Sequence, residues 1–222
     1  SDLKVQKYVY PETYPDISLT SAIELLLEVA EEWTQPMTTD NYWTELSAAK
    51  ADAETYKADA DITKQKEVLD ALQTALDHVN AVGDITYLRP TIALAGNEGI
   101  DVAAATQFCI DGTTSGVPML NALRVARQIK AKGSHTTFTG SEPTVGETYY
   151  LYNVGQGLFL CPSLVGSHEL ALGFAGDPLT LESNTAGGYQ LKGTIRADGY
   201  IGHQWGTQGF FDGAANVATS SW

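Results

Sequence analysis

The sequence contains little cysteine for its length. Two cysteines, Cys109 and Cys161, in 222 residues are too few for a disulfide scaffold, and neither belongs to a Cys-x-x-Cys pair. We expect both to be buried free thiols, because an unpaired cysteine behaves as a small hydrophobic residue. A single bridge between them is the alternative in an oxidising compartment.

Positive charge and long apolar runs are also scarce. The chain has 13 Lys and Arg against 27 Asp and Glu, a formal net charge of -14. Phosphate backbones are held by clustered Lys and Arg, so this composition argues against nucleic acid and anionic membranes as partners. No stretch approaches the roughly 18 apolar residues that suggest a membrane-spanning helix. We therefore expect no transmembrane segment.

Signatures of catalysis and metal binding are missing as well. The sequence has neither a Gly-Lys-Ser/Thr phosphate loop nor a Gly-x-Ser-x-Gly elbow. Asp59-x-Asp61 begins like a calcium loop, but Lys64 and Asp70 stand where Gly and Glu are needed, which favours helix capping. The four histidines are scattered: His78, His135, His168 and His203. We expect no cofactor, no metal site and no enzyme activity, with a hydrolase as the weaker alternative.

Two regions of different composition are present. Residues 1–133 contain six of the 21 glycines and carry 20 acidic and 11 basic side chains, whereas residues 134–222 contain the other 15 glycines and carry 7 and 2. The first composition is typical of helices and the second of short strands and turns. We predict an α+β protein of two domains: an extended tail (1–19), an antiparallel helical bundle (20–133), a linker (134–146) and a small all-β domain (147–222).

Apolar periodicity places the helices. The first is expected to begin at the capping box Ser21-x-x-Glu24 and to end before Pro36. A second opens near Asp40, and a third begins near Thr63 and ends at Gly83. Two shorter helices are predicted in "IDVAAATQFCI" and in "PMLNALRVARQIKAK".

The second and third of these helices carry a family resemblance. The stretch "NYWTELSAAKADAETYKADADITKQKEVLDALQTALDHV" has an aromatic residue early in one helix, a short acidic turn, and then a helix of the form VxxAxxxLxxxV. It resembles a FIVAR-type helical repeat over about residues 20–82. The resemblance implies a three-helix module that acts as a spacer or adhesive segment in secreted and surface proteins of bacteria.

The glycine-rich region opens with "YYLYNVGQGLFL", residues 149–160. A dinucleotide-binding loop would need a third glycine and a following helix, whereas Gly157 is followed by strand-like residues and Pro162. Two strands joined by a turn with glycines fit better. Further short runs at intervals of about eight to twelve residues predict a small barrel or sandwich.

A weak internal repeat relates residues 150–160 to residues 189–201. The pattern Tyr-x-Tyr-x-Asn-x-Gly-x-Gly-x-Phe-Leu resembles the start of a ricin-type beta-trefoil lectin repeat. The resemblance implies a partial trefoil-like domain, because 89 residues are too few for three repeats of about forty. The family's Gln-x-Trp motif is represented only by Gln204-Trp205.

The candidate binding residues lie in "GYIGHQWGTQGFFDG", residues 199–213. Sugars are bound by an aromatic face together with a few amide, carboxylate or imidazole groups. We predict Trp205, His203, Gln204 and Asp212 as ligand-binding residues. Four neighbours are expected in the core instead: Tyr200, Ile201, Phe210 and Phe211.

The combination of modules is similar to surface lipoproteins of gut anaerobic bacteria. The resemblance implies an extracytoplasmic protein on the cell surface, anchored to the outer membrane by a lipidated cysteine before Ser1. The expected function is non-catalytic binding or adhesion, directed at a glycan or a surface protein. The alternative is an accessory subunit of an outer-membrane TonB-dependent nutrient-uptake complex.

Overall fold

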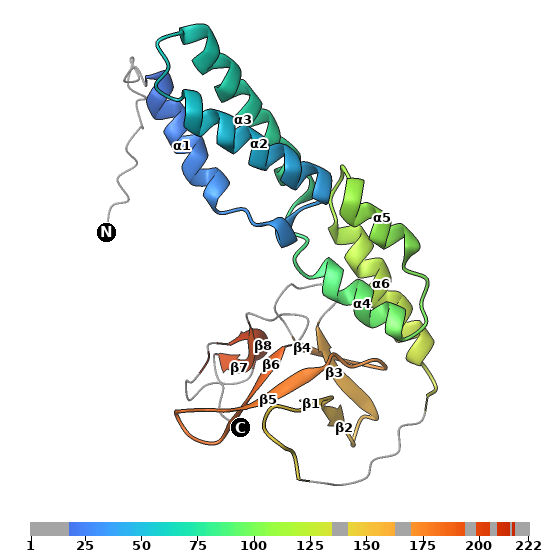
Figure 1. Cartoon of the computed structure of the whole chain (residues 1–222). Coiled ribbons are helices and arrows are strands. Elements are labelled where there is room, and N and C mark those ends of the chain that lie inside the picture. Colours follow the sequence, from blue (N-terminus) through green and yellow to red (C-terminus); the bar gives the residue numbers. More distant parts are fainter. Residues whose placement is uncertain are drawn as a thin grey trace, which may run out of the picture. The chain divides into compact units, whose positions relative to one another are not determined.

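A computed structural model describes residues 18–134, 142–162, 170–193, 199–204, 208–213 and 215. Helices occupy the N-terminal part and small antiparallel sheets the C-terminal part, which confirms the predicted α+β class (Figure 1). Contacts divide the chain into two compact units, one with residues up to 34 and 42–79, the other with residues 35–41 and 80–222. The second unit therefore combines the later helices with the sheets. Of the predicted tail (1–19), residues 1–17 lie outside the described residues, and Leu19 already belongs to the first helix.

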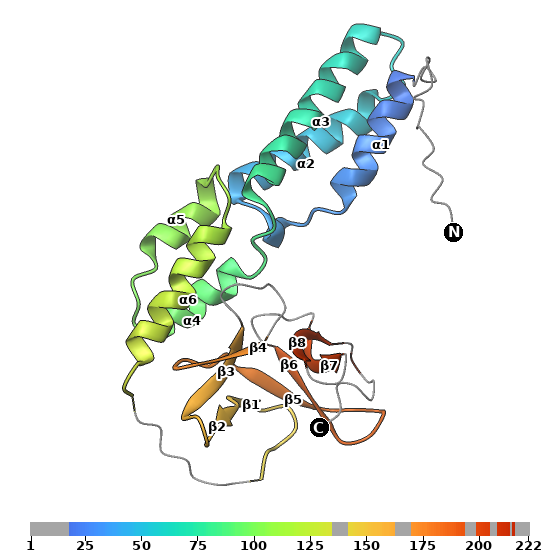
Figure 2. The same ribbon diagram turned by 180° about the vertical axis from the view of Figure 1, so that it is seen from behind.

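The first unit is a bundle of three antiparallel helices, which lie side by side in both views (Figures 1 and 2). They are α1 (Leu19–Glu31), α2 (Asp40–Tyr56) and α3 (Ile62–Val82), with a short 3-10 turn at Gln35–Met37 between the first two. The apolar spacing predicted this arrangement. None of the helices in the described part of the chain is long and apolar enough to cross a membrane.

The helix ends follow local side-chain capping. The predicted start at Ser21 was wrong, because the Oγ of Ser18 accepts a hydrogen bond from the Ser21 amide at 3.1 Å and makes Ser18 the N-cap. Asp61 caps α3 through the Thr63 amide at 2.8 Å, as the capping interpretation predicted. Gly83, with φ +72°, ends this helix.

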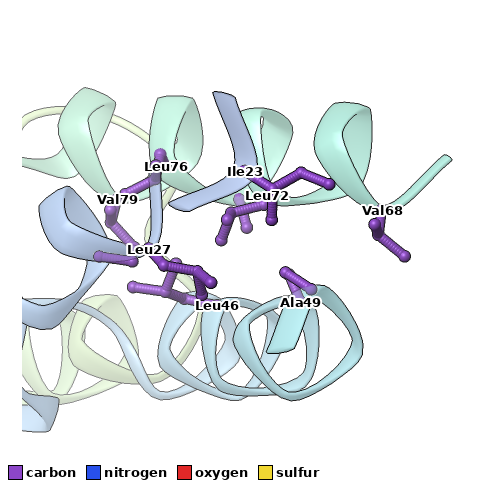
Figure 3. Close-up of a cluster of buried hydrophobic side chains, with 11 residues drawn as sticks. Ile23, Leu27, Leu46, Ala49, Val68, Leu72, Leu76 and Val79 are labelled. Atoms are coloured by element: carbon purple, nitrogen blue, oxygen red, sulfur yellow. The ribbon is translucent and has the colours of Figure 1, made fainter. Parts of the chain in front are cut away.

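The core of the bundle consists of apolar side chains that recur at helical spacing on the three helices (Figure 3). Leu46 of α2 and Leu72 of α3 are both 0% exposed. The remaining buried members are Ile23, Leu27, Ala30, Ala49, Ala53, Val68, Ala75, Leu76 and Val79. Burial of such side chains is the dominant force that stabilises a bundle of this size.

Three more helices begin the second unit: α4 (Leu88–Asn97), α5 (Ala103–Asp111) and α6 (Val117–Ala131). Helix α4 packs against both α5 and α6. The last two lie where they were predicted, and Pro118 stands in the first turn of α6. No helix was predicted for Leu88–Asn97. Its Pro90 is tolerated because the first turn of a helix has no intrahelical partner for a backbone N–H.

The strands form two antiparallel sheets. One has the order β1-β5-β6-β7-β8 and the other the order β2-β3-β4. The strands are β1 (Thr148–Tyr149), β2 (Tyr152–Asn153), β3 (Leu158–Pro162), β4 (Leu170–Gly173), β5 (Leu179–Ser183), β6 (Tyr189–Gly193), β7 (Tyr200–Gln204) and β8 (Gln208–Gly213). Both sheets contribute to one apolar cluster around Leu179 and Ile201, each 0% exposed.

The predicted hairpin is present as β2 and β3. Gly157 has φ +68°, and its amide donates to the Asn153 carbonyl at 2.8 Å to close the turn. The run "TYYLYN" does not form a single strand, however. Tyr149 pairs with Leu179 in one sheet, and Tyr152 pairs with Phe159 in the other. Tyr150 and Leu151 lie at the crossing between the sheets.

We expect Leu72→Ala to lower the free energy of unfolding by about 3 kcal/mol, because the substitution leaves a cavity at a fully buried position. Leu25→Ala is the matched control, since Leu25 of α1 is 52% exposed, and its effect should stay within about 0.5 kcal/mol. Urea denaturation followed by circular dichroism measures both. Equal effects of the two substitutions would contradict the assigned core.

Candidate ligand-binding site

The predicted ligand-binding residues lie on the last two strands. His203 and Gln204 belong to β7 and Asp212 to β8, which are antiparallel neighbours. His203 pairs with Gly209 and Gln204 with Gln208, so these two stand at the turn end of the pair and Asp212 nearer the other end. Trp205 lies outside the described residues. The structure brings the strands together but describes none of these four side chains.

A different part of the second unit contains a pocket of about 620 Å³, within the usual size range of small-molecule sites. One side, here called the helical wall, comprises Glu98, Arg127, Lys130, Ala131 and Ser134. The other, here called the strand wall, comprises Thr148, Tyr149, Tyr150, Phe159, Ala175 and Gly176. Charged groups of the helices thus face aromatic rings of the sheets.

The crossing between the two sheets places the aromatic rings. Tyr150 is 48% exposed, and its ring meets that of Phe159 edge-on with centroids 6.4 Å apart. Tyr152 lies against the same phenylalanine at 4.8 Å. Tyr149 accepts a hydrogen bond from the Thr144 amide at 2.7 Å through its hydroxyl oxygen. The rings are therefore held by neighbours, while Tyr150 remains half-exposed.

Arg127 is the buried cation of the helical wall. Its side chain is only 3% exposed and binds Glu98 through both carboxylate oxygens, each at 2.8 Å. It also donates to the Asp177 carboxylate and to the Gly176 carbonyl oxygen, both at 2.6 Å. We call Arg127, Glu98 and Asp177 the Arg127 cluster. Its planar guanidinium suits this arrangement, since it offers several N–H groups in a fixed plane.

Charge compensation explains how the arginine can be buried. Desolvation would lower the pKa of the Arg127 guanidinium, but hydrogen bonds and charges from Glu98 and Asp177 outweigh it, and the pKa is raised. Burial raises the pKa of the Asp177 carboxyl, and the Arg127 charge opposes that shift. The ionised form of Asp177 therefore depends on Arg127.

Gln128, the next residue of α6, reinforces the contact. Its side-chain amide donates to the Ala175 carbonyl oxygen at 2.9 Å and accepts from the Ala175 amide at 3.0 Å. The segment from Gly173 to Gly176 lies close to Gln128 of α6 and to Phe159 of β3 because it contains glycines. A Cβ at Gly173 would lie 2.4 Å from Gln128 Oε1, and one at Gly176 would lie 2.9 Å from Phe159 Cβ. A larger residue at position 173 would displace the side-chain amide of Gln128, and one at position 176 would press against the body of Phe159.

The polar groups of the pocket are suited to hydrogen bonding. Burial raises the pKa of the Tyr150 phenol, with Arg127 opposing the shift and Glu98 and Asp177 adding to it, so the hydroxyl stays protonated at neutral pH. Lys130 donates through Nζ to the Gly99 carbonyl oxygen at 2.8 Å, at the end of α4. The arrangement combines a half-exposed tyrosine with hydrogen-bond donors and acceptors, which can orient a polar ligand.

The sequence contains only part of the signal for this pocket. Tyr150 belongs to the quoted strand run, but the break between sheets that exposes its ring leaves no local pattern. Arg127 and Asp177 are 50 residues apart, so their pairing depends on the tertiary fold. The available clue was Arg127, which lies on the same side of α6 as the buried Leu123. Because arginine is rarely buried unless it is paired, its place there indicates an acidic partner elsewhere in the chain.

Comparison with known proteins does not assign a family. No family model matches the sequence, and a match is found neither among curated proteins nor among solved structures.

Both cysteines are buried free thiols in the structure, as predicted. Burial, with a contribution from Asp177, raises the pKa of Cys161 to about 11, and burial raises the pKa of Cys109. Only the thiolate reacts rapidly with disulfide reagents.

We therefore expect neither thiol of the native protein to react quickly with Ellman's reagent at pH 8, and both to react once the chain is unfolded. The native rate of Cys161 should rise as the pH approaches its pKa. A disulfide bridge would be revealed by unfolded protein that shows no reactive thiol without a reductant. Rapid labelling of the native protein at pH 8 would contradict the assigned burial.

Proposed function

We propose that this is a non-catalytic binding protein of the cell surface, that its ligand is a glycan, and that the pocket between the helical and strand walls holds a sugar. One observation carries the proposal: the half-exposed Tyr150, whose ring packs edge-on against Phe159, lines a pocket that Arg127 and Glu98 line as well.

The chemistry of sugars matches this combination. A sugar ring presents C–H groups on one face, which pack on an aromatic ring, and hydroxyl groups at its edge, which need hydrogen-bond partners. Tyr150 supplies the ring, and Glu98, Lys130 and Ser134 supply polar groups around it. A pocket of about 620 Å³ is large enough for a small saccharide, since pockets of roughly 300 Å³ and above accept drug-sized ligands.

The charges support a binding role for the pocket. Glu98 and Arg127 form two hydrogen bonds with each other. This pair gives the pocket polar groups in fixed positions, and the charges of its two members offset one another. The whole chain carries a formal charge of -14, which repels polyanionic partners. Display at the cell surface and a role in adhesion rest on the resemblance to FIVAR-type and ricin-type modules.

A glycan array probed with the native protein and with Tyr150→Ala tests the proposal. We expect the native protein to bind at least one glycan and Tyr150→Ala to bind it roughly fivefold more weakly, since a ring contact contributes on the order of 1 kcal/mol. Tyr189→Ala is the matched control, because Tyr189 is 45% exposed but lies on β6 and does not line the pocket. Its binding should be unchanged.

A third variant, Trp205→Ala, separates this pocket from the predicted site on β7 and β8. Loss of binding in Trp205→Ala with no change in Tyr150→Ala would move the site to the predicted residues. Absence of binding to any glycan would contradict the proposed ligand class. Co-purification of the native protein with an outer-membrane importer, together with no binding to any glycan on the array, would favour the accessory-subunit alternative.

A further inference from the structure

The two walls of the pocket are joined by polar contacts from two consecutive residues of α6. Arg127 binds Asp177 and the Gly176 carbonyl oxygen, and Gln128 makes a two-way amide pairing with Ala175. Polar contacts of this kind between parts of one chain permit relative motion more readily than an apolar interface does. The shape of the pocket therefore depends on how well these few bonds are made.

From this geometry we infer that Arg127 and Asp177 are positioning residues for the pocket: their ion pair holds the strand wall at its working distance from the helical wall, and ligand affinity depends on it although Asp177 does not line the pocket. The inference rests on the proposed function, because it concerns the same pocket. In that proposal Tyr150 contacts the sugar directly. The ion pair affects binding indirectly, because it sets the position of the strand wall that carries the Tyr150 ring.

The position of Arg127 gives it this role. It binds Glu98, at the end of α4, with one edge of its guanidinium, and Asp177 and Gly176 with the remaining N–H groups. A single cation thus fixes three segments that are distant in the sequence. Lysine would keep the charge, but its ammonium is a point donor and cannot satisfy both carboxylates and the carbonyl in one plane.

Coupling to ligand follows from mass action. If the walls are correctly spaced in only a fraction of the molecules, the apparent affinity falls by that fraction. A sugar that contacts both walls binds only the molecules whose walls are correctly spaced, and it therefore raises the population of that state. Weakening the ion pair should therefore lower affinity, and bound sugar should restore the spacing.

Distance measurements between spin labels test the inference on the whole chain. Ile129→Cys on α6 and Val154→Cys in the β2–β3 turn provide the two sites, since these side chains are 70% and 82% exposed, whereas the native thiols are buried. We expect one narrow distance distribution for the parent protein without ligand, and a broader one for Arg127→Lys and for Asp177→Asn.

Arg89→Lys is the matched control. Arg89 likewise joins separate segments of the second unit, through the Asp40 carboxylate at 2.8 Å and the Cys109 carbonyl oxygen at 3.1 Å, but it does not line the pocket. Its distribution should remain narrow. Should Arg127→Lys fail to fold by circular dichroism, the milder Asp177→Asn carries the test, because it retains the bidentate Glu98 pair.

The glycan that binds most strongly on the array serves as the probe in a second measurement. We expect its affinity for Asp177→Asn to fall roughly tenfold, as it would if a tenth of the molecules were competent, and its addition at saturation to narrow the distribution again. Unchanged distributions in both ion-pair variants would overturn the inference. The first distance distributions are measured without ligand. If no glycan on the array binds, the proposed function is rejected, but the comparison of distances between the parent protein and the ion-pair variants still tests the positioning role.

Discussion

A guanidinium that is removed from water must find its solvation inside the protein, and Arg127 imposes this requirement on the second unit. Two carboxylates and a backbone carbonyl have to converge on it, one carboxylate from the end of α4 and the other groups from the segment before β5. The cost of leaving such a charge unpaired is several kcal/mol. The helices and the sheets therefore form one unit by contact, and the pocket lies where they meet.

The two units of the chain are stabilised by different forces. In the first, apolar stripes on three helices bury one another, and the hydrophobic effect is non-directional. In the second, hydrogen bonds with fixed geometry join α6 to the strands. Contacts of this second kind need a fixed donor–acceptor geometry, whereas apolar packing does not.

Sequence patterns predicted the elements better than their connections. The buried positions around Leu46 and Leu72 followed from helical periodicity, and the turn at Gly157 followed from its glycines, because both signals are local. The start of α1 was misplaced since Ser18 and Ser21 both qualify as caps, and only backbone geometry decides between them. Helix α4 was not predicted, because Pro90 obscures a segment that is helical from Leu88.

The pocket was beyond reach from sequence for a related reason. Its chemistry joins Arg127 to Asp177 across 50 residues, and no periodic pattern records such a pairing. The concentration of aromatic, amide, carboxylate and imidazole groups in residues 199–213 directed attention to Trp205, His203, Gln204 and Asp212, whose side chains the structure does not describe. The exposed ring of Tyr150 was concealed within a run that looks like one continuous strand.

That run has a further consequence for what the chain can tolerate. Tyr149 is registered against Leu179 in one sheet and Tyr152 against Phe159 in the other, so only two residues span the gap between two fixed alignments. An inserted or deleted residue here has no loop to absorb it, and β1 or β2 would have to slip by one residue against its neighbour, which turns the side chains of that strand to the opposite face. The number of residues between β1 and β2 is therefore constrained as tightly as their type, although the segment is partly exposed.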